Sequence, residues 1–180
     1  MKSWKRELLK TGIYILVVLG ITYLIIHFVG QRTKVRGDSM FPTMHDGDNL
    51  IVDKISYRFN EPKRFDIIVF HPVREKEDVY YIKRVIGLPN ERVRIDENGY
   101  IYINGERLTE SYGYQVINDP GVAIEEIQLK EDEYFVLGDN RNASTDSRSL
   151  FVGNVHKDTI IGKAWLKIWP IGRFGFVKHR

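Results

Sequence analysis

Residues 79–86 read VYYIKRVI, and this run decides the fold class of the chain. Every side chain in it except Lys83 and Arg84 is β-branched or aromatic, the two kinds of residue that strands favour. The run therefore predicts a strand, and Gly87-Leu88-Pro89-Asn90 predicts where that strand ends. Comparable short runs, separated by turn residues, follow a single long apolar segment. We therefore expect a chain that is mainly β.

Further strands are expected wherever β-branched residues cluster between turn residues. These runs cover residues 49–55, 66–70, 92–96, 100–103, 134–137 and 160–169. Asn98-Gly99 predicts a hairpin, because both turn positions accept positive φ, and Asn104-Gly105 predicts a second tight turn. Residues 109–130 are polar and irregular, and we expect them to form an insertion or a lid.

Composition excludes several classes of function. Lys and Arg number 27 against 24 Asp and Glu, and the small excess is spread along the chain, so nucleic-acid binding has little support. The chain has no cysteine, which excludes disulfides, thiolate catalysis and Cys-based zinc sites. It has neither an HExxH sequence nor a phosphate-binding GxxxxGKS or GxxxxGKT loop. No metal ion or other cofactor is expected.

Residues 12–30, GIYILVVLGITYLIIHFVG, contain no Asp, Glu, Lys or Arg. As a helix this run would be about 29 Å long at ~1.5 Å per residue, enough for a hydrocarbon core of ~30 Å. It is too long, and has the wrong flanks, for a cleaved signal peptide. We expect a single transmembrane anchor over residues 11–30, followed by one domain of about 145 residues.

The charges that flank the apolar run favour one orientation in the membrane. Four Lys and Arg residues precede the run with only Glu7 opposing them, and positive flanks tend to stay in the cytoplasm. Arg32, Lys34 and Arg36 follow the run and weaken this bias. We expect a cytoplasmic N-terminus over residues 1–10 and an extracytoplasmic domain over residues 31–180.

Residues 37–43, GDSMFPT, begin soon after the apolar run and place Ser39 in a short turn. Gly37 lets the backbone approach a ligand closely, and Pro42 stiffens the exit from the turn. Such a turn can present a nucleophile. A serine hydroxyl is inert at neutral pH unless a neighbouring base takes its proton, so the chain needs a base near Ser39.

Lys83 is the first candidate for this base. In a strand its side chain shares a face with Tyr81 and Val85, where an ammonium is poorly solvated. Desolvation favours the neutral amine and lowers the pKa of a lysine. A pKa of about 8 would leave roughly 10 % of the amine neutral at pH 7, enough for a general base. The alternative is a lysine that extends into solvent from an edge strand.

A Ser-His-Asp arrangement is the second possibility, and spacing alone does not reject it. Its histidine would be His45 or His71. Its carboxylate would come from Asp38, Asp46, Asp48 or Asp66.

Residues 138–148, GDNRNASTDSR, are rich in Gly, Asn, Asp and Ser and predict a loop. We expect ion pairs between Asp139 and Arg148, or between Asp146 and Arg141, to hold this loop rigid beside a site. Ser144 in the same loop is a candidate to orient an amine.

Taken in order, these segments resemble the bacterial type I signal peptidases, in particular those of the Gram-positive branch. The resemblance rests on the anchor, Ser39-Met40-x-Pro42-Thr43, Gly47-Asp48, residues 81–89 (YIKRVIGLP), and Gly138-Asp139-Asn140-Arg141 with Ser144, Asp146, Ser147 and Arg148. Each motif is weak alone, but their order behind an anchor is specific. The resemblance covers nearly the whole chain apart from residues 109–130.

The resemblance implies a mostly antiparallel β catalytic domain with a Ser-Lys dyad. Ser39 would be the nucleophile, its backbone N–H a donor to the oxyanion, and Lys83 the general base. Ser144 would hydrogen-bond the lysine amine. Asp146 and Arg148 would form a structural ion pair near the site, with Asp139 and Arg141 in the same loop.

The chain departs from the family pattern at two places. Some members carry a hydroxyl donor two residues before the nucleophile, where this chain has Gly37. Asn90-Glu91 replaces the usual Gly-Asp, and we expect only a local change because Asn tolerates a left-handed turn.

The resemblance further implies a membrane-bound serine endopeptidase that removes N-terminal signal peptides from exported preproteins. Its partners would be preprotein signal peptides and membrane lipid, with no nucleic acid, and it would be a monomer in the plasma membrane with its catalytic domain on the extracellular face. An extended substrate would pair with a sheet edge near Asp38 or Tyr81. Met40 and Phe41 would rest against lipid.

Two other functions remain to be weighed. A self-cleaving Ser-Lys peptidase of the repressor type would need a DNA-binding module, for which the chain has no room. A tethered β module that binds extended peptides without cleaving them would keep the same motifs, and a single-turnover assay would separate it from an enzyme.

Overall fold

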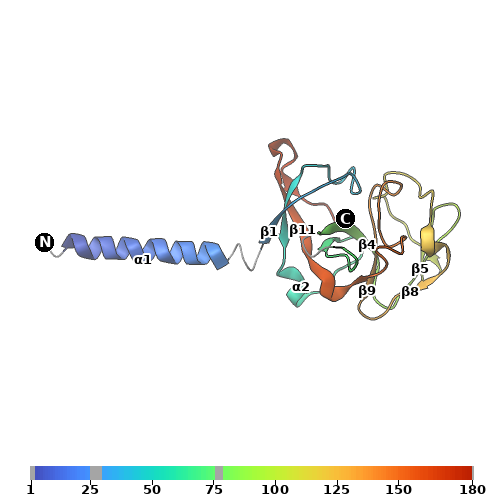
Figure 1. Ribbon diagram of the computed structural model, residues 1–180, viewed down its shortest axis with the longest axis horizontal. Helices are drawn as coiled ribbons and strands as arrows, with labels where there is room; N and C mark the ends of the chain where they lie inside the picture. Colours follow the sequence, from blue (N-terminus) through green and yellow to red (C-terminus); the bar gives the residue numbers. More distant parts are fainter. Residues whose placement is uncertain (1–2, 25–29, 76–78, 180) are drawn as a thin grey trace.

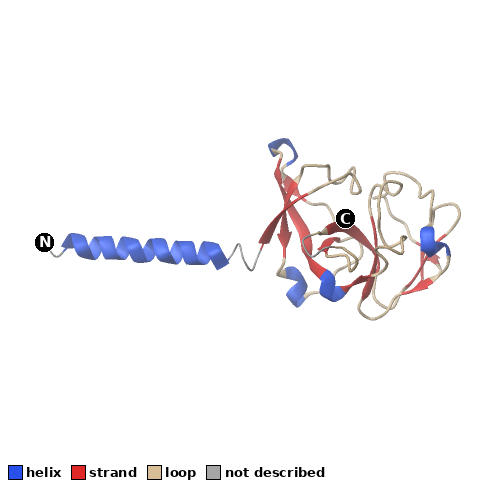
Figure 2. Cartoon of the chain, viewed as in Figure 1, coloured by secondary structure: helices blue, strands red, loops and turns tan. Residues whose placement is uncertain are grey.

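The computed structural model describes residues 3–24, 30–75 and 79–179. Within these ranges the part after the first helix is mainly β (Figures 1 and 2). The elements in order are α1 Ser3–Leu24, β1 Gly30–Lys34, β2 Asn49–Asp53, α2 Ser56–Phe59, β3 Ile67–Phe70, β4 Tyr81–Gly87, β5 Arg92–Ile95, β6 Ile101–Ile103, β7 Glu106–Arg107, η2 Gly121–Ile124, β8 Ile127–Gln128, β9 Glu133–Leu137, β10 Val155–His156, η3 Lys157–Thr159, β11 Ile160–Trp169, η4 Ile171–Arg173 and β12 Gly175–Phe176.

The strands form two antiparallel sheets. The larger has eight strands in the order β1-β2-β11-β3-β4-β9-β10, with β12 paired to β11. The smaller has four strands in the order β7-β6-β5-β8 and lies at the far end of the domain from α1 (Figure 1). The expected mainly β, antiparallel architecture is therefore confirmed.

Helix α1 carries apolar side chains that are exposed on all sides, among them Ile13, Leu16 and Val17, which are 52–69 % exposed. The expected anchor over residues 11–30 is described only in part, because residues 25–29 lie outside the described residues. Within the described ranges, no helix combines the length and the apolar character needed to cross a membrane.

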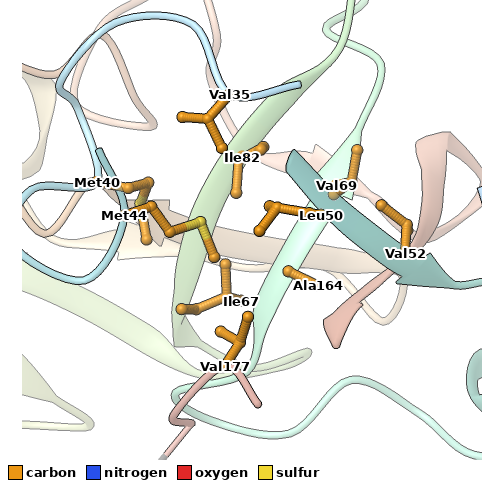
Figure 3. Close-up of a cluster of buried hydrophobic side chains, with 10 residues drawn as sticks. All are labelled: Val35, Met40, Met44, Leu50, Val52, Ile67, Val69, Ile82, Ala164 and Val177. Carbon is orange, nitrogen blue, oxygen red and sulfur yellow. The ribbon is translucent and has the colours of Figure 1, made fainter. Parts of the chain in front are cut away.

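One apolar cluster joins the larger sheet to the turn that carries Ser39 (Figure 3). Its members are Val35, Met40, Met44, Leu50, Val52, Ile67, Val69, Ile82, Ala164 and Val177. Met40 is 1 % exposed and Met44 is fully buried, so the residues after Ser39 fix the turn to the core. The expectation that Met40 rests against lipid is therefore wrong.

Strand β4 lies inside the larger sheet, between β3 and β9. Lys83 pairs with Ile68 of β3, and β9 joins the other side of β4 only from Arg84 onward. Lys83 is 4 % exposed, so the alternative of a solvated lysine on an edge strand is wrong. Along residues 81–83 the side of β4 away from β3 has no strand paired to it among the described residues.

Two of the expected local structures differ in detail. The hairpin at Asn98-Gly99 is present, but only Gly99 has positive φ, at 78°. Asp96 explains this, since its Oδ1 accepts the N–H groups of Asn98 and Tyr100 and holds a longer turn. The turn with positive φ at both positions is Asn104-Gly105, at 53° and 84°.

Strand β2 is shorter than the expected run of residues 49–55. It ends at Asp53, whose Oδ1 accepts the N–H groups of Ile55 and Ser56, and α2 begins there. Asn90 has φ 65°, the left-handed conformation expected for it. Glu91 beside it pairs with Arg64, which keeps the departure from the family pattern local.

The C-terminal residues return into the domain. Val177 joins the apolar cluster, and His179 Nδ1 accepts the Ile67 N–H at 3.0 Å. Burial lowers the pKa of His179 to about 4, so the ring is neutral at pH 7 and able to accept. This contact fixes the end of the chain to the start of β3.

Candidate active site

The turn that carries Ser39 is held by its own backbone and by one carboxylate. Gly37 has φ 79°, a conformation that favours glycine, and its N–H donates to Asp46 Oδ1 at 2.8 Å. The Phe41 N–H donates to Asp38 O at 3.0 Å. Within the described residues the Ser39 N–H has no acceptor, so it is free to bind a ligand oxygen.

The structure brings Lys83 to this turn. Its Nζ lies 2.8 Å from Ser39 Oγ, although the two residues are far apart in the sequence. Burial lowers the pKa of Lys83 to about 8, against the opposing effect of the Asp146 and Asp139 carboxylates. At pH 7 about a tenth of the Lys83 amine is therefore neutral, and it is hydrogen-bonded to the Ser39 hydroxyl.

Neither candidate histidine, His45 or His71, is hydrogen-bonded to Ser39 among the described residues. His45 packs edge-on against Phe41, with ring centroids 5.2 Å apart, and its Nδ1 is buried without a hydrogen-bond partner among the described residues. His71 Nδ1 lies 2.8 Å from Pro72 O. The possibility of a Ser-His-Asp arrangement is therefore wrong, and Asp46 and Asp48 serve the turn instead, by accepting backbone N–H groups.

Hydrogen bonds from the loop of residues 138–148 hold the Ser39 turn in place. The Asn140 N–H donates to Ser39 O at 3.0 Å, and Asn140 Nδ2 donates to Asp38 O at 3.2 Å. Thr43 Oγ1 donates to Asp139 Oδ2 at 2.5 Å. Backbone and side chains of the loop thus hold both ends of the turn.

The expected ion pairs Asp139–Arg148 and Asp146–Arg141 are wrong. Asp139 and Arg141 instead pair with residues outside this loop. Asp139 pairs with Arg84 through two hydrogen bonds of 2.8 and 2.7 Å, and both side chains are fully buried. Arg141 pairs with Glu110 at 2.7 Å. The pair that the family resemblance implied, Asp146 with Arg148, is present at 2.8 Å.

Sequence reasoning missed Arg84 and Glu110. The signal for Arg84 was available, because a guanidinium in a strand as apolar as VYYIKRVI must find a carboxylate inside the domain. Glu110 carried no such signal, since its surroundings in the sequence are polar.

Ser144 does not make the expected hydrogen bond to the Lys83 amine. Its Oγ is buried and has no hydrogen-bond partner among the described residues. It lies against Gly138, where an added Cβ would be 2.3 Å from Ser144 Oγ and 2.5 Å from Ser39 O. Ser144 therefore lies next to the Ser39 turn, but its hydroxyl is not hydrogen-bonded to the Lys83 amine.

A groove of about 690 Å³ opens beside the Ser39-Lys83 pair. One side is lined by residues 31–40 and the other by residues 79–83, with Ala143 and Thr145 also in contact. Within the described residues no group of three His, Asp or Glu side chains is placed to hold a metal ion. The Ser39 hydroxyl and the Lys83 amine lie at this groove.

A serine hydroxyl against a buried amine, at the edge of a groove in a β domain, is the arrangement of serine hydrolases that use lysine in place of histidine. The family model for the signal peptidases, peptidase S26, matches residues 7–169. The chain belongs to this family, and it is a serine endopeptidase of the signal peptidase I type.

The chain is also similar to individual signal peptidases. The chain is 41 % identical to signal peptidase I of Leptolyngbya laminosa, over 94 % of this chain and 82 % of the relative. It is 31 % identical to signal peptidase IB of Staphylococcus aureus strain MRSA252, over 96 % and 95 %. A crystal structure of a signal peptidase I from Enterococcus faecalis V583 is 32 % identical, covers 58 % of this chain and 97 % of its own, and has a TM-score of 0.45.

Proposed function

We propose that this chain is a membrane-bound endopeptidase that removes N-terminal signal peptides from exported preproteins, with Ser39 as nucleophile and Lys83 as general base. The observation that carries the proposal is the 2.8 Å distance between Lys83 Nζ and Ser39 Oγ, made by an amine that is buried. A base must lie within hydrogen-bond reach of the proton it removes, and among the described residues Lys83 is the basic side chain hydrogen-bonded to Ser39 Oγ.

In the acylation step the neutral Lys83 amine accepts the Ser39 hydroxyl proton while Oγ bonds to the carbonyl carbon of the scissile peptide bond. The Ser39 N–H donates to the oxyanion that forms. Gly37 has no hydroxyl, and its N–H already donates to Asp46, so it adds nothing to the oxyanion site. The Lys83 ammonium then gives its proton to the leaving amine, and the C–N bond breaks.

Deacylation repeats these steps with water. The neutral amine takes a proton from a water molecule, whose oxygen attacks the acyl carbon, and the ammonium returns a proton to Ser39 Oγ as the ester bond breaks. The signal peptide leaves with a new carboxylate. The Asn140 contact to Ser39 O keeps the nucleophile against the amine throughout.

The groove suits an extended peptide. Along residues 81–83 one side of β4 has no paired strand among the described residues, so its backbone groups are available to a substrate strand. Residues of the Ser39 turn line the opposite wall. Alternate substrate side chains would then point into the groove.

We propose the topology expected from the sequence: a cytoplasmic N-terminus over residues 1–10, an anchor over residues 11–30 and an extracytoplasmic catalytic domain over residues 31–180. The absence of charge from residues 12–30 and the exposed apolar side chains of α1 support an anchor. Anchoring would place the enzyme and its membrane-borne substrate on one surface and raise their effective concentration.

An aromatic surface on the domain supports contact with lipid. It consists of Trp165, Trp169, Ile171, Phe174 and Phe176, which are 46–75 % exposed. Trp169 pairs with Asn49 of β2, which in turn pairs with Lys34 of β1, so β2 alone lies between the strand that carries Trp165 and Trp169 and the first strand after the proposed anchor. Aromatic and basic side chains together are typical of a membrane interface.

The test uses the full chain in detergent with a signal-peptide substrate under single-turnover conditions. Ser39→Ala and Lys83→Ala should each abolish cleavage by at least about a thousandfold while the thermal unfolding midpoint stays close to that of the wild type or above it. His45→Ala is the matched control and should retain cleavage. Substantial activity in Lys83→Ala would contradict the dyad, and substrate binding without any product in the wild type would favour a peptide-binding module.

A further inference from the structure

Residues 110–114, here called the strap, lie against the loop of residues 138–148 on the side that does not line the groove. They belong to the segment that the family motifs do not cover. Their contacts reach the loop at its first residues, close to where the loop holds the Ser39 turn. The strap is therefore connected to the Ser39-Lys83 pair without touching the space that a substrate would fill.

One carboxylate organises the strap and attaches it to the loop. Glu110 Oε2 accepts the N–H groups of Tyr112 at 2.7 Å and Gly113 at 3.3 Å. Glu110 Oε1 binds Arg141 Nη1 at 2.7 Å, and Arg141 Nε donates to Gly138 O at 3.0 Å. Gly138 packs against Ser39 O, so a short series of contacts runs from Glu110 to the nucleophile.

The charge of Glu110 matters because Arg141 is almost completely buried. Arg141 is 2 % exposed, and its Nη2 has no hydrogen-bond partner among the described residues. Without Glu110 the guanidinium would be a buried cation with no carboxylate paired to it, a costly state that a protein relieves by letting water in. The loop would have to shift for water to reach it.

The two tyrosines of the strap contact the other parts of the site. The Tyr112 ring lies 3.8 Å from the Arg84 guanidinium carbon and covers the Arg84-Asp139 pair. The Tyr114 N–H donates to Asp139 O at 2.8 Å, and its ring packs edge-on against Phe41 with centroids 4.8 Å apart. The strap thus contacts both the loop and the Ser39 turn that the loop holds.

We propose that Glu110 is a positioning residue for the Ser39-Lys83 pair: its carboxylate joins the strap to Arg141 and so keeps the loop, and with it the Ser39 turn, against the buried amine. The proposal rests on the proposed function of that pair. It assigns a role to the segment that distinguishes this chain from the motifs of its family.

The test compares Glu110→Gln with the wild type in the full chain, with kcat, KM and the pH dependence of kcat/KM measured on one signal-peptide substrate. We expect kcat to fall about tenfold to a hundredfold, because a small displacement of reacting groups has that effect. KM should stay within about twofold, because the strap does not line the groove.

The acid limb of kcat/KM separates positioning from a purely structural role. The carboxylates that act on the Lys83 amine are those of Asp146 and Asp139, so loss of the Glu110 charge should not move its pKa directly. If the loop shifts and water reaches the amine, the limb should move up by about one pH unit. A variant that is merely less stable would keep the limb of the wild type.

Controls come from the same chain. Glu126→Gln removes an exposed partner of Arg92, at 3.1 Å, by the same chemical change and should leave kcat unchanged. Glu110→Asp keeps the charge, and its kcat should lie between the kcat of Glu110→Gln and that of the wild type. In the background of Arg141→Gln, adding Glu110→Gln should change kcat by less than about twofold, because both residues act through one contact.

Hydrogen exchange gives a readout that needs no substrate. The Asn140 amide, which donates to Ser39 O, should exchange at least about tenfold faster in Glu110→Gln. An unchanged kcat, an unmoved acid limb or an unchanged Asn140 exchange rate would overturn the positioning role. The role would also be overturned if Glu110→Gln and Arg141→Gln together lowered kcat by the product of their separate effects. A wild type that does not cleave would instead overturn the proposed function, while the exchange rate still tests the link from Glu110 to Ser39.

Discussion

Burial of the Lys83 amine costs the folded domain stability and makes the amine reactive. Its pKa falls from 10.5 in the unfolded chain to about 8, a difference worth about 3 kcal/mol. The cost is present in full below about pH 8, where both states hold the proton. Between about pH 8 and 10.5 the unfolded chain binds the proton more tightly, so this contribution to stability improves as the pH rises.

The same pKa predicts how activity depends on pH. In the proposed mechanism only the neutral Lys83 amine accepts the Ser39 proton, so kcat/KM should rise about tenfold per pH unit below pH 7 and level off above about pH 8. Steady-state kinetics on a signal-peptide substrate from pH 6 to pH 10 would check this, over a range where the fold is shown to be intact. If kcat/KM instead levelled off near the ordinary pKa of lysine, the amine would be solvated. If kcat/KM did not change with pH, the amine would not be the base.

Arg84 shows what residue-level reasoning can and cannot predict. Its neighbours in the sequence predict burial, and burial of a guanidinium predicts a carboxylate partner. They do not say which carboxylate. Asp139 is in reach because β9 pairs with β4 from Arg84 onward and delivers the following loop to that point. Loss of one partner should therefore leave an uncompensated buried charge.

At the scale of elements, the site depends on a turn and a loop that meet with almost no space between them. Gly138 is the closest point, because a Cβ there would be 2.5 Å from the Ser39 carbonyl oxygen and 2.3 Å from Ser144 Oγ. The same Cβ would be 2.5 Å from Ser144 Cβ, which a side-chain rotation does not move, and the Ser39 carbonyl belongs to the backbone of the turn. Glycine is required at this position for close approach and not for an unusual φ.

Gly138→Ala should therefore displace the Ser39 turn. We expect kcat to fall by about a hundredfold or more, together with a loss of about 1–3 kcal/mol in the free energy of unfolding from overpacking. Gly172→Ala, where an added Cβ meets nothing within 4 Å, is the matched control and should have little effect. Denaturant unfolding and kinetics on the two variants would check this, and full activity in Gly138→Ala would show that the contact is not tight in solution.

Strand β4 is the element that sequence reasoning predicted best. Its β-branched and aromatic residues predicted a strand, and alternation placed Lys83 on one face and Arg84 on the other, while an edge position in the sheet was left open. Nothing local indicated that β9 would pair with only the second half of it. That partial pairing leaves residues 81–83 available to a substrate strand, and it results from where the loop of residues 138–148 leaves the sheet.

At the scale of the whole molecule, the aromatic surface and the proposed anchor lie toward the same part of the domain. Strand β1 follows the anchor, and β2 connects it laterally to β11, which carries Trp165 and Trp169 (Figure 1). Within this aromatic patch the Trp165 and Phe176 rings lie 5.7 Å apart. We expect this patch to rest in the membrane interface.

Fluorescence quenching would check this orientation. With Trp4→Phe, the remaining tryptophans are Trp165 and Trp169, and their emission should be quenched in vesicles with brominated acyl chains relative to ordinary vesicles. Trp165→Phe combined with Trp169→Phe, with Trp4 retained, gives the signal of α1 alone. Equal emission of Trp165 and Trp169 in the two kinds of vesicle would show that the patch faces solvent.

The fold class, the positions of most strands and the turn that carries Ser39 follow from the sequence, because the local alternation of side chains and turn chemistry specify them. The tertiary structure was needed to show that Lys83 is buried, that Asp139 pairs with Arg84, that Arg141 pairs with Glu110 and that, in the part of the chain that the structure describes, no histidine is hydrogen-bonded to the Ser39 hydroxyl. Each of these depends on which distant segments the sheet brings within a few ångströms of one another. Spacing along a chain carries no information about that distance.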